Sequence, residues 1–274
     1  MSFVLNGPLL LVGAGRMGGA MLAGWLARGL DPRQVIVQDP SPPPEIAALI
    51  ERHGIPAHAQ LPKLATPPAV LLAAVKPQAM DEVFPPVARA AGPETLILSV
   101  AAGKTIASFA AHLPPRAAIV RAIPNTPAAI GRGITVCVAN AFVTPAQRAL
   151  CDALLGAVGE VGWVDREALI DAATAVSGSG PAYVFLLAEC LAEAARQVGL
   201  DAALARRLAD ATVAGAGELL HRSGEDPAVL RQNVTSPNGT TFAALQVLMG
   251  ADGLQPLLTR AVAAAEKRSR ELSG

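Results

Sequence analysis

Residues 235–241, "TSPNGTT", combine four hydroxyl side chains, a proline and an Asn-Gly pair just before the apolar run "FAALQVL". This composition predicts the first turn of a helix over 239–249. The first backbone N–H groups of a helix have no intrahelical acceptor, so a capping side chain, water or an anion must bind them. One interpretation is a helix capped by Ser236 or Asn238 with no ligand. The other is an anion-binding turn formed by Gly239, Thr240 and Thr241.

A glycine-rich turn near the amino terminus, "LLLVGAGRMGGAMLAGWL", is a second candidate site. Gly13, Gly15 and Gly18 follow an apolar run and open a helical segment. In a strand–turn–helix context the first glycine permits the tight turn and the second lets a pyrophosphate approach the backbone. The third lets helix and strand pack closely, and the helix N-terminus then faces the phosphates. The turn therefore predicts a dinucleotide site.

Three other residues belong to this candidate site. Met17 and Arg16 lie inside the turn, where Arg16 either contacts a phosphate or is solvated. Asp39 ends the second apolar run, about twenty residues after Gly18, where an acid that binds the adenosine ribose is expected. Such a carboxylate would repel a 2′-phosphate, so Asp39 predicts that NADH is used at least as well as NADPH, unless neighbours such as Ser41 hold the phosphate. The alternative is an aspartate that ends a strand in solvent.

Three later apolar runs end in residues that could line the same ligand, because parallel sheets bind ligands at the carboxyl ends of their strands. "LLAAVKPQ" ends in a lysine that could also be an ordinary surface residue. "LILSVAAGKT" ends in small residues that leave space for a flat ring such as nicotinamide, and prolines stiffen "RAIPNTPA". The candidate cofactor-binding residues are Ala74, Val75, Lys76, Pro77, Ala101, Ala102, Gly103 and Asn125.

The elements that must position these residues alternate over the first 164 residues. Strands are predicted at 8–13, 35–39, 69–75, 95–100 and 117–123, and helices at 16–29, 43–53, 78–91 and 104–112. Two further runs, 133–140 and 160–164, extend the sheet around a helix over 145–157. This order is typical of parallel βαβ units and predicts an α/β, Rossmann-type, mostly parallel sheet domain over residues 1–164.

Residues 165–274 are predicted to form an all-helical dimerisation domain. Its helices are expected at 166–176, 180–199, 201–222, 227–232, 239–249 and 253–272. Two of them carry alanine and glycine where a surface helix would carry charge. A helix that is apolar nearly all round requires burial on all sides, which a domain of this size cannot easily supply alone. We therefore expect a subunit interface; the alternative is a compact monomeric bundle.

Composition excludes several classes of function. The chain has 274 residues, 52% hydrophobic and only 16% charged, with a formal net charge of zero, so sequence-independent nucleic-acid binding is disfavoured. Glu189 and Glu193 interrupt the most apolar late run, which disfavours a membrane span, and the amino terminus lacks the basic region of a signal peptide. Cys137, Cys151 and Cys190 form no CxxC pair. We expect small buried thiols, no metal site and a reducing, cytoplasmic location.

Taken together, the motifs resemble those of the pyrroline-5-carboxylate reductase family. The resemblance runs in order through "VGAGRMGGA", "AVKPQ", "SVAAG", "RAIPNTPA", "AVSGSGPAY" and "VTSPNGTTFAAL", nearly the whole chain. It implies reduction of 1-pyrroline-5-carboxylate to L-proline, the last step of proline biosynthesis, with hydride from NADPH or NADH. It also implies helical domains that interlock as homodimers, often assembled further into rings.

The resemblance assigns roles within "TSPNGTT" and "SGSGP". It implies that backbone N–H groups of Gly239, Thr240 and Thr241 bind the substrate carboxylate and that the Thr241 hydroxyl faces the ring nitrogen as the catalytic hydrogen-bond partner. Ser177 would lie near the nicotinamide, or only cap the next helix. Family members often have glycine where this chain has Asn238; because asparagine tolerates positive φ, the turn is expected to survive.

Two other functions compete with this hypothesis. A β-hydroxyacid dehydrogenase has a similar two-domain plan but uses a lysine on the long helix after the nucleotide domain, and no lysine occurs here between Lys104 and Lys267. A non-catalytic dinucleotide-sensing protein would keep the glycine turn but would not need "TSPNGTT" at a pocket.

Overall fold

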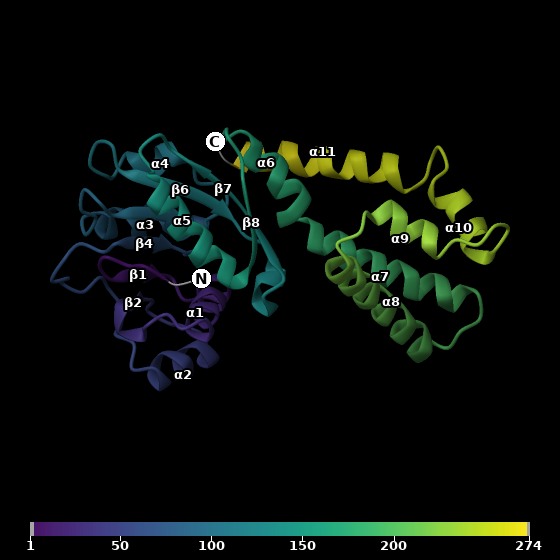
Figure 1. Cartoon of the computed structure of the whole chain (residues 1–274), viewed down its shortest axis with the longest axis horizontal. Helices are drawn as coiled ribbons and strands as arrows, with labels where there is room; N and C mark the ends of the chain where they lie inside the picture. Colours follow the sequence, from purple (N-terminus) through teal and green to yellow (C-terminus); the bar gives the residue numbers. More distant parts are fainter. Residues whose placement is uncertain (1–2, 273–274) are drawn as a thin grey trace. The chain divides into compact units, whose positions relative to one another are not determined.

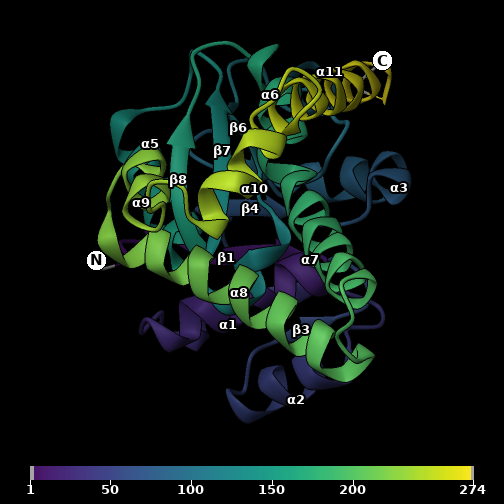
Figure 2. The ribbon, with the colours of Figure 1, turned by 90° about the vertical axis from the view of Figure 1, so that its right-hand side faces the viewer.

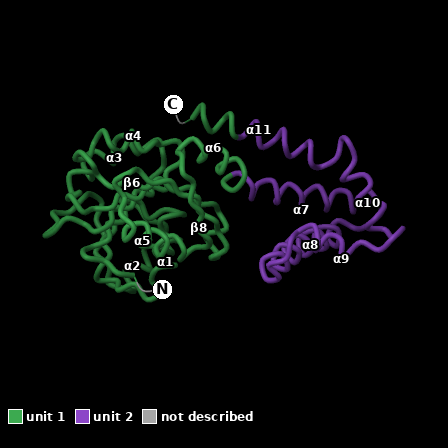
Figure 3. The backbone as a smooth tube through the Cα atoms, turned by 45° about the horizontal axis from the view of Figure 1, so that its top comes forward, with its two compact units in different colours: residues 1–178, 266–274 green, residues 179–265 purple. Residues whose placement is uncertain are grey.

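The protein, seen in a computed structural model that describes residues 3–272, divides into two compact units. The first runs from the amino terminus to Gly178 and resumes at Glu266; the second is Ser179–Ala265 (Figure 3). The strands, coloured purple to teal in Figure 1, all belong to the first unit.

The first unit is built on one eight-stranded sheet with the order β3-β2-β1-β4-β5-β6-β7-β8. The strands are β1 (Leu9–Val12), β2 (Val35–Gln38), β3 (Ala57–His58), β4 (Val70–Ala73), β5 (Leu96–Ser99), β6 (Ala118–Ile123), β7 (Gly133–Ala139) and β8 (Gly159–Trp163). All neighbours pair in parallel except β6 and β7, which are antiparallel. Figure 2 shows β7 and β8 side by side. The sheet is therefore mostly parallel, as predicted.

Helices cover both faces of this sheet, which explains why its central strands are almost entirely apolar, with Ser99 and Arg121 as buried exceptions. Every residue of β1, β4, β5 and β6 is buried. Residues of α1 (Arg16–Ala27), α2 (Pro44–Arg52) and α5 (Pro145–Leu155) share one core with alternate strand residues. Residues of α3 (Pro77–Ala88) and α4 (Ile106–Ala110) share a second core with the other alternate residues. A strand buried on both faces needs apolar residues in a continuous run.

Most polar side-chain atoms in the core have hydrogen-bond partners; among the described residues Gln38 Oε1 and Arg121 Nε are buried without one. The Trp25 ring is fully buried, and its Nε1 donates a hydrogen bond of 2.8 Å to the carbonyl oxygen of Leu154. This bond joins α1 to α5 across the chain and fixes the helix that follows the glycine turn. Buried indole N–H groups require such an acceptor.

The second unit contains α7 (Gly180–Gln197), α8 (Ala202–Ser223), α9 (Pro227–Asn233), α10 (Thr240–Leu248) and most of α11 (Leu254–Leu272). Ala205 and Ala209 are its only buried hydrophobic residues among those described. Large apolar side chains of α7 are exposed, including Val184, Phe185, Leu186, Leu187 and Leu191. These helices lack a core of their own, which supports the predicted interface.

Two details of the predicted elements were wrong. Strand β3 was not predicted, because its two residues are exposed and form no apolar run. The helix predicted over 166–176 is instead α6 (Leu169–Ala173) followed by a π-helical turn, Thr174–Gly178.

The cysteine prediction holds for two of the three thiols. Cys137 and Cys151 are buried, whereas Cys190 is exposed because it lies on the uncovered helix α7. One stretch of the described residues, Leu169–Gln197, is long and apolar enough to span a membrane by length and composition alone.

Candidate functional site

The glycine turn has the geometry that its three spaced glycines predict. Gly13 has φ +91°, and a Cβ atom placed on it would lie 2.8 Å from the carbonyl oxygen of Ala74. A Cβ atom on Gly18 would lie 2.0 Å from the carbonyl oxygen of Gly13. Both contacts are with backbone and shorter than van der Waals distance, so only glycine fits at either position.

Gly15 differs from its two neighbours in the motif, because a Cβ atom on it would meet nothing within 4 Å. Its φ of −66° is also open to any residue. The fold therefore does not require glycine here, and the space beside this backbone is available to a ligand. Gly15 precedes the first turn of α1, which contains no acidic side chain, so the positive end of the helix dipole faces this space. Arg16 is exposed and Met17 half-buried at the same turn.

Asp39 follows β2 and holds the glycine turn. Its Oδ2 accepts a 2.6 Å hydrogen bond from the backbone N–H of Ala14, and its Oδ1 accepts one of 2.8 Å from the N–H of Ser41. Sequence reasoning weighed a ribose contact against a solvated aspartate and missed this bracing of the turn. Each carboxylate oxygen has a second lone pair, so the bracing leaves acceptor sites for ribose hydroxyls.

The next two strand ends lie at the same edge of the sheet. The Ala74 N–H donates to the carbonyl of Val12, and the Val100 N–H donates to that of Ala73. The predicted residues follow directly. Lys76 is exposed before α3 and Ala101 is buried, while Ala102 is exposed and Gly103 has φ +71°. The small residues keep this edge free of bulky side chains.

Asn125 ties three segments together just after β6. Its Nδ2 donates a 3.1 Å hydrogen bond to the carbonyl of Ser177, and its Oδ1 accepts one of 2.9 Å from the N–H of Ile134. The Ser177 hydroxyl, in the π-helical turn, donates to the carbonyl of Ala173 at the end of α6. The amide of Asn125 thus holds this turn beside the sheet edge; its predicted contact with a cofactor stays a prediction. π-Helical turns of this kind are frequent at functional sites.

The "TSPNGTT" segment forms the start of α10, as predicted. Asn238 adopts φ +58°, so the turn keeps a left-handed residue where glycine is common. Gly239 is the N-cap, and its carbonyl accepts from the N–H of Ala243. Within residues 3–272 no side chain caps this turn, which removes the self-capped interpretation. The N–H of Gly239 donates a 3.1 Å hydrogen bond to the carbonyl of Ser236, so the N–H groups of this turn that an anion can bind are those after Gly239.

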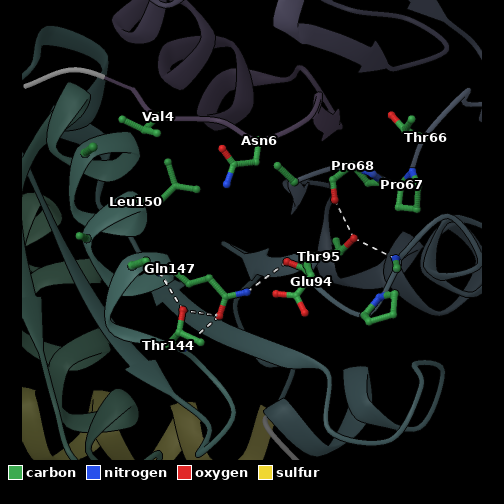
Figure 4. Close-up of a pocket in the computed structure, with 16 residues that line it drawn as sticks. Val4, Asn6, Thr66, Pro67, Pro68, Glu94, Thr95, Thr144, Gln147 and Leu150 are labelled. Carbon is green, nitrogen blue, oxygen red and sulfur yellow. Dashed lines mark hydrogen bonds between the residues drawn. The ribbon is translucent and has the colours of Figure 1, made fainter.

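A cavity of about 710 Å³ lies elsewhere, at the amino ends of β4 and β5 (Figure 4). Figure 4 shows the Thr95 hydroxyl bonded to the carbonyl of Pro68, and Gln147 bonded to the carbonyl of Glu94. None of the predicted site residues lines this cavity. It is therefore separate from the candidate site.

Known protein families match both halves of the chain. The family described as "Pyrroline-5-carboxylate reductase dimerisation" matches residues 167–272, and that described as "NADP oxidoreductase coenzyme F420-dependent" matches residues 9–103. A pyrroline-5-carboxylate reductase of Pseudomonas aeruginosa is 40% identical over 97% of this chain and 96% of its own length.

Solved structures show the same similarity. A pyrroline-5-carboxylate reductase from Coxiella burnetii superposes with a TM-score of 0.91 at 35% identity, covering 98% of this chain and 99% of its own. The Plasmodium falciparum enzyme, solved with NADP bound, gives 0.79 at 26% identity, covering 98% and 99% of the two chains.

The strand order, the glycine turn and the helical second unit define an oxidoreductase with a Rossmann-type domain. Within that class, the chain belongs to the pyrroline-5-carboxylate reductase family. The fold predicted from sequence is confirmed, and so is the family. The dimerisation match assigns the helical half to oligomerisation.

Proposed function

We propose that the protein reduces 1-pyrroline-5-carboxylate to L-proline with NADPH or NADH, as the last step of proline biosynthesis. The observation that carries this proposal is family similarity over 97% of the chain, a span that includes both the glycine turn and the start of α10. Neither alternative function accounts for similarity to this family over nearly the whole chain. A β-hydroxyacid dehydrogenase would need a lysine that the helical half lacks before Lys267.

The cofactor would lie along the carboxyl edge of the sheet. The open space at Gly15 suits a pyrophosphate, and Asp39 suits ribose hydroxyls. The small residues Ala101 and Ala102 suit the nicotinamide, which when bound supplies the hydride. The relative from Plasmodium falciparum was solved with NADP. Because Asp39 is fixed by Ala14 and cannot easily move from a 2′-phosphate, we expect NADH to be used at least as well here. A strong preference for NADPH in steady-state kinetics would contradict this expectation.

The substrate would be held by the first turn of α10. Backbone N–H groups of Gly239, Thr240 and Thr241 bind its carboxylate, with the Gly239 N–H exchanging its bond to the Ser236 carbonyl for the ligand. The helix dipole favours that anion. An imine accepts hydride most easily as the iminium. The Thr241 hydroxyl accepts a hydrogen bond from the protonated ring nitrogen, so the substrate binds already protonated and no histidine is required. Ser177, in the turn held by Asn125, is a further substrate contact in this proposal.

We propose a homodimer formed through the helical domain, residues 165–274, which assembles further into a ring. On α7 the Phe185 side chain is 63% exposed and the Leu186 side chain 57% exposed. A second copy of the chain packed on this face would remove that apolar surface from water. The apolar stretch Leu169–Gln197 ends with this helix, and a dimer interface explains its apolar character without a membrane. The predicted nucleotide domain is residues 1–164, and the location is cytoplasmic.

The test is direct. Purified protein is mixed with pyrroline-5-carboxylate and either NADH or NADPH, and the loss of nicotinamide absorbance is followed. Turnover supports the proposal, and no turnover with either cofactor favours a dinucleotide sensor. Turnover of β-hydroxyacids but not of the imine would favour the dehydrogenase.

A further inference from the structure

The β5–α4 loop, residues 100–105, contains the small residues that the proposed function places at the nicotinamide. Its far end is held by a carboxylate distant in the sequence. Glu167 Oε1 accepts a 2.8 Å hydrogen bond from the backbone N–H of Ile106, the first residue of α4. The interaction spans 61 residues and ties the end of the loop to the segment that leads into α6.

The same oxygen of Glu167 also accepts a 3.0 Å bond from Nη1 of Arg121. Arg121 lies on β6 and only 2% of its side chain is exposed. Its Nε has no hydrogen-bond partner in the described part of the chain. Separating a buried guanidinium from its carboxylate would leave an uncompensated charge in the core, which is strongly destabilising. The ion pair with Arg121 therefore holds the Glu167 carboxylate in place. The position of the Ile106 N–H is therefore set from the interior of the sheet.

Two further contacts fix the loop from other sides. Lys104 Nζ lies 2.6 Å and 2.7 Å from the two carboxylate oxygens of Asp81 on α3. A Cβ atom on Gly103 would lie 3.1 Å from the carbonyl oxygen of Leu272, at the end of α11. Glu167 differs from these contacts because its partner Arg121 is buried, whereas the Asp81 side chain is 78% exposed. Exposed pairs contribute little, so Glu167 is the dominant restraint.

We propose that Glu167 is a positioning residue for the nicotinamide half of the cofactor site. It acts through the Ile106 N–H, which fixes the β5–α4 loop and so the surface at Ala101, Ala102 and Gly103. It touches neither cofactor nor substrate. The inference rests on the proposed function, because it assumes that a nicotinamide binds this loop.

In this proposal the two halves of the cofactor depend on different residues. The adenosine half depends on Gly15 and Asp39, which Glu167 does not contact, whereas the nicotinamide half depends on the loop. Glu167→Ala removes the acceptor for Ile106 and the charge opposite Arg121. Glu167→Gln keeps an acceptor and removes only the charge. Glu160→Gln is the matched control, because Glu160 is an exposed carboxylate on β8.

The experiment measures dissociation constants for NADH, NADPH and ADP-ribose for each variant. If NADPH is the better cofactor, 2′-phospho-ADP-ribose is measured as well. The constants kcat and KM are determined for the same variants. We expect Glu167→Ala to weaken the dinucleotides while ADP-ribose binds as to the unaltered protein. We expect kcat to fall by up to about 100-fold, as displacement of reacting groups by about 1 Å can cause. Glu167→Gln should show the same pattern with a smaller effect, and Glu160→Gln should change nothing.

Two results would overturn the proposal. One is an equal loss of ADP-ribose and dinucleotide binding, which indicates general damage to the domain. The other is a folded variant with unchanged kcat and dinucleotide affinity. If Glu167→Ala fails to fold, Glu167→Gln decides between these outcomes. Failure of the proposed function itself would be seen separately, as absence of imine turnover in the unaltered protein.

Discussion

Replacing Gly15 by alanine should separate cofactor binding from folding. The added Cβ atom meets nothing within 4 Å, and φ is −66°, so the native backbone accepts alanine without strain. Alanine also restricts the unfolded chain more than glycine does, which stabilises the folded state by about 0.4–1 kcal/mol. The variant should therefore fold as well as the parent protein or slightly better.

Binding should change in the opposite direction. The methyl group would fill the space where the pyrophosphate is proposed to meet the backbone. Losing one charge-assisted hydrogen bond to a phosphate costs about 1.5–3 kcal/mol. Since each 1.4 kcal/mol is about tenfold in affinity, the dissociation constant for NADH or NADPH should rise roughly 10- to 150-fold.

Gly18→Ala is the contrasting variant, because its Cβ atom would lie 2.0 Å from the carbonyl oxygen of Gly13. Forcing an atom into a packed interior costs about 1–3 kcal/mol. At about 2–4 °C per kcal/mol for a chain of this size, its melting temperature should fall by roughly 2–12 °C. Thermal unfolding without ligand and fluorescence titration with NADH and NADPH measure both quantities.

Two results with these variants would refute the proposed role of Gly15. If Gly15→Ala binds the dinucleotides as tightly as the parent protein, no pyrophosphate lies against this backbone. If Gly15→Ala is instead destabilised as much as Gly18→Ala, the backbone at Gly15 is tightly packed and leaves no space for a pyrophosphate.

Three further predictions follow from the helical unit and the core. Thr241→Ala should lower kcat/KM by about 1–3 kcal/mol, or roughly 5- to 150-fold, while Thr241→Ser retains most activity; an unchanged rate for the alanine variant would exclude the proposed hydrogen bond. Phe185→Glu places a charge on the exposed apolar face of α7 and should yield monomers in size-exclusion chromatography with light scattering, whereas a dimer of unchanged affinity would place the interface elsewhere. Burial, reinforced by Asp152, raises the pKa of the Cys151 thiol to about 12. Its contribution to stability is present below the unfolded pKa of about 8.5 and is lost as pH rises above it, so Cys151→Ala should lose stability less steeply in denaturation at alkaline pH; equal slopes would contradict that pKa.

Much of the fold could be predicted because local patterns determine it. Strands buried on both faces require continuous apolar runs, and β1, β4 and β5 show them plainly. The glycine spacing also has a local cause, since Gly13 and Gly18 approach each other within a few residues. These features depend on the chain's immediate neighbourhood, so a single sequence reveals them.

The contacts that hold the site were not predictable, since they join distant parts of the chain. Glu167 meets Ile106 across 61 residues and Arg121 across 46. The ribose contact of Asp39 stays a prediction, and its bond to the Ala14 N–H, which depends on how β2 lies beside β1, was not predicted. No local pattern marks a carboxylate that binds remote backbone.

Reduction of the cyclic imine to proline changes two quantities that can be followed together. The most direct measurement follows nicotinamide oxidation and proline formation in the same reaction, started by adding pyrroline-5-carboxylate to the protein with NADH or NADPH. We expect one proline to form for each nicotinamide oxidised, in amounts proportional to the protein added. Nicotinamide that stays reduced with both cofactors, or is oxidised without forming proline, would contradict it.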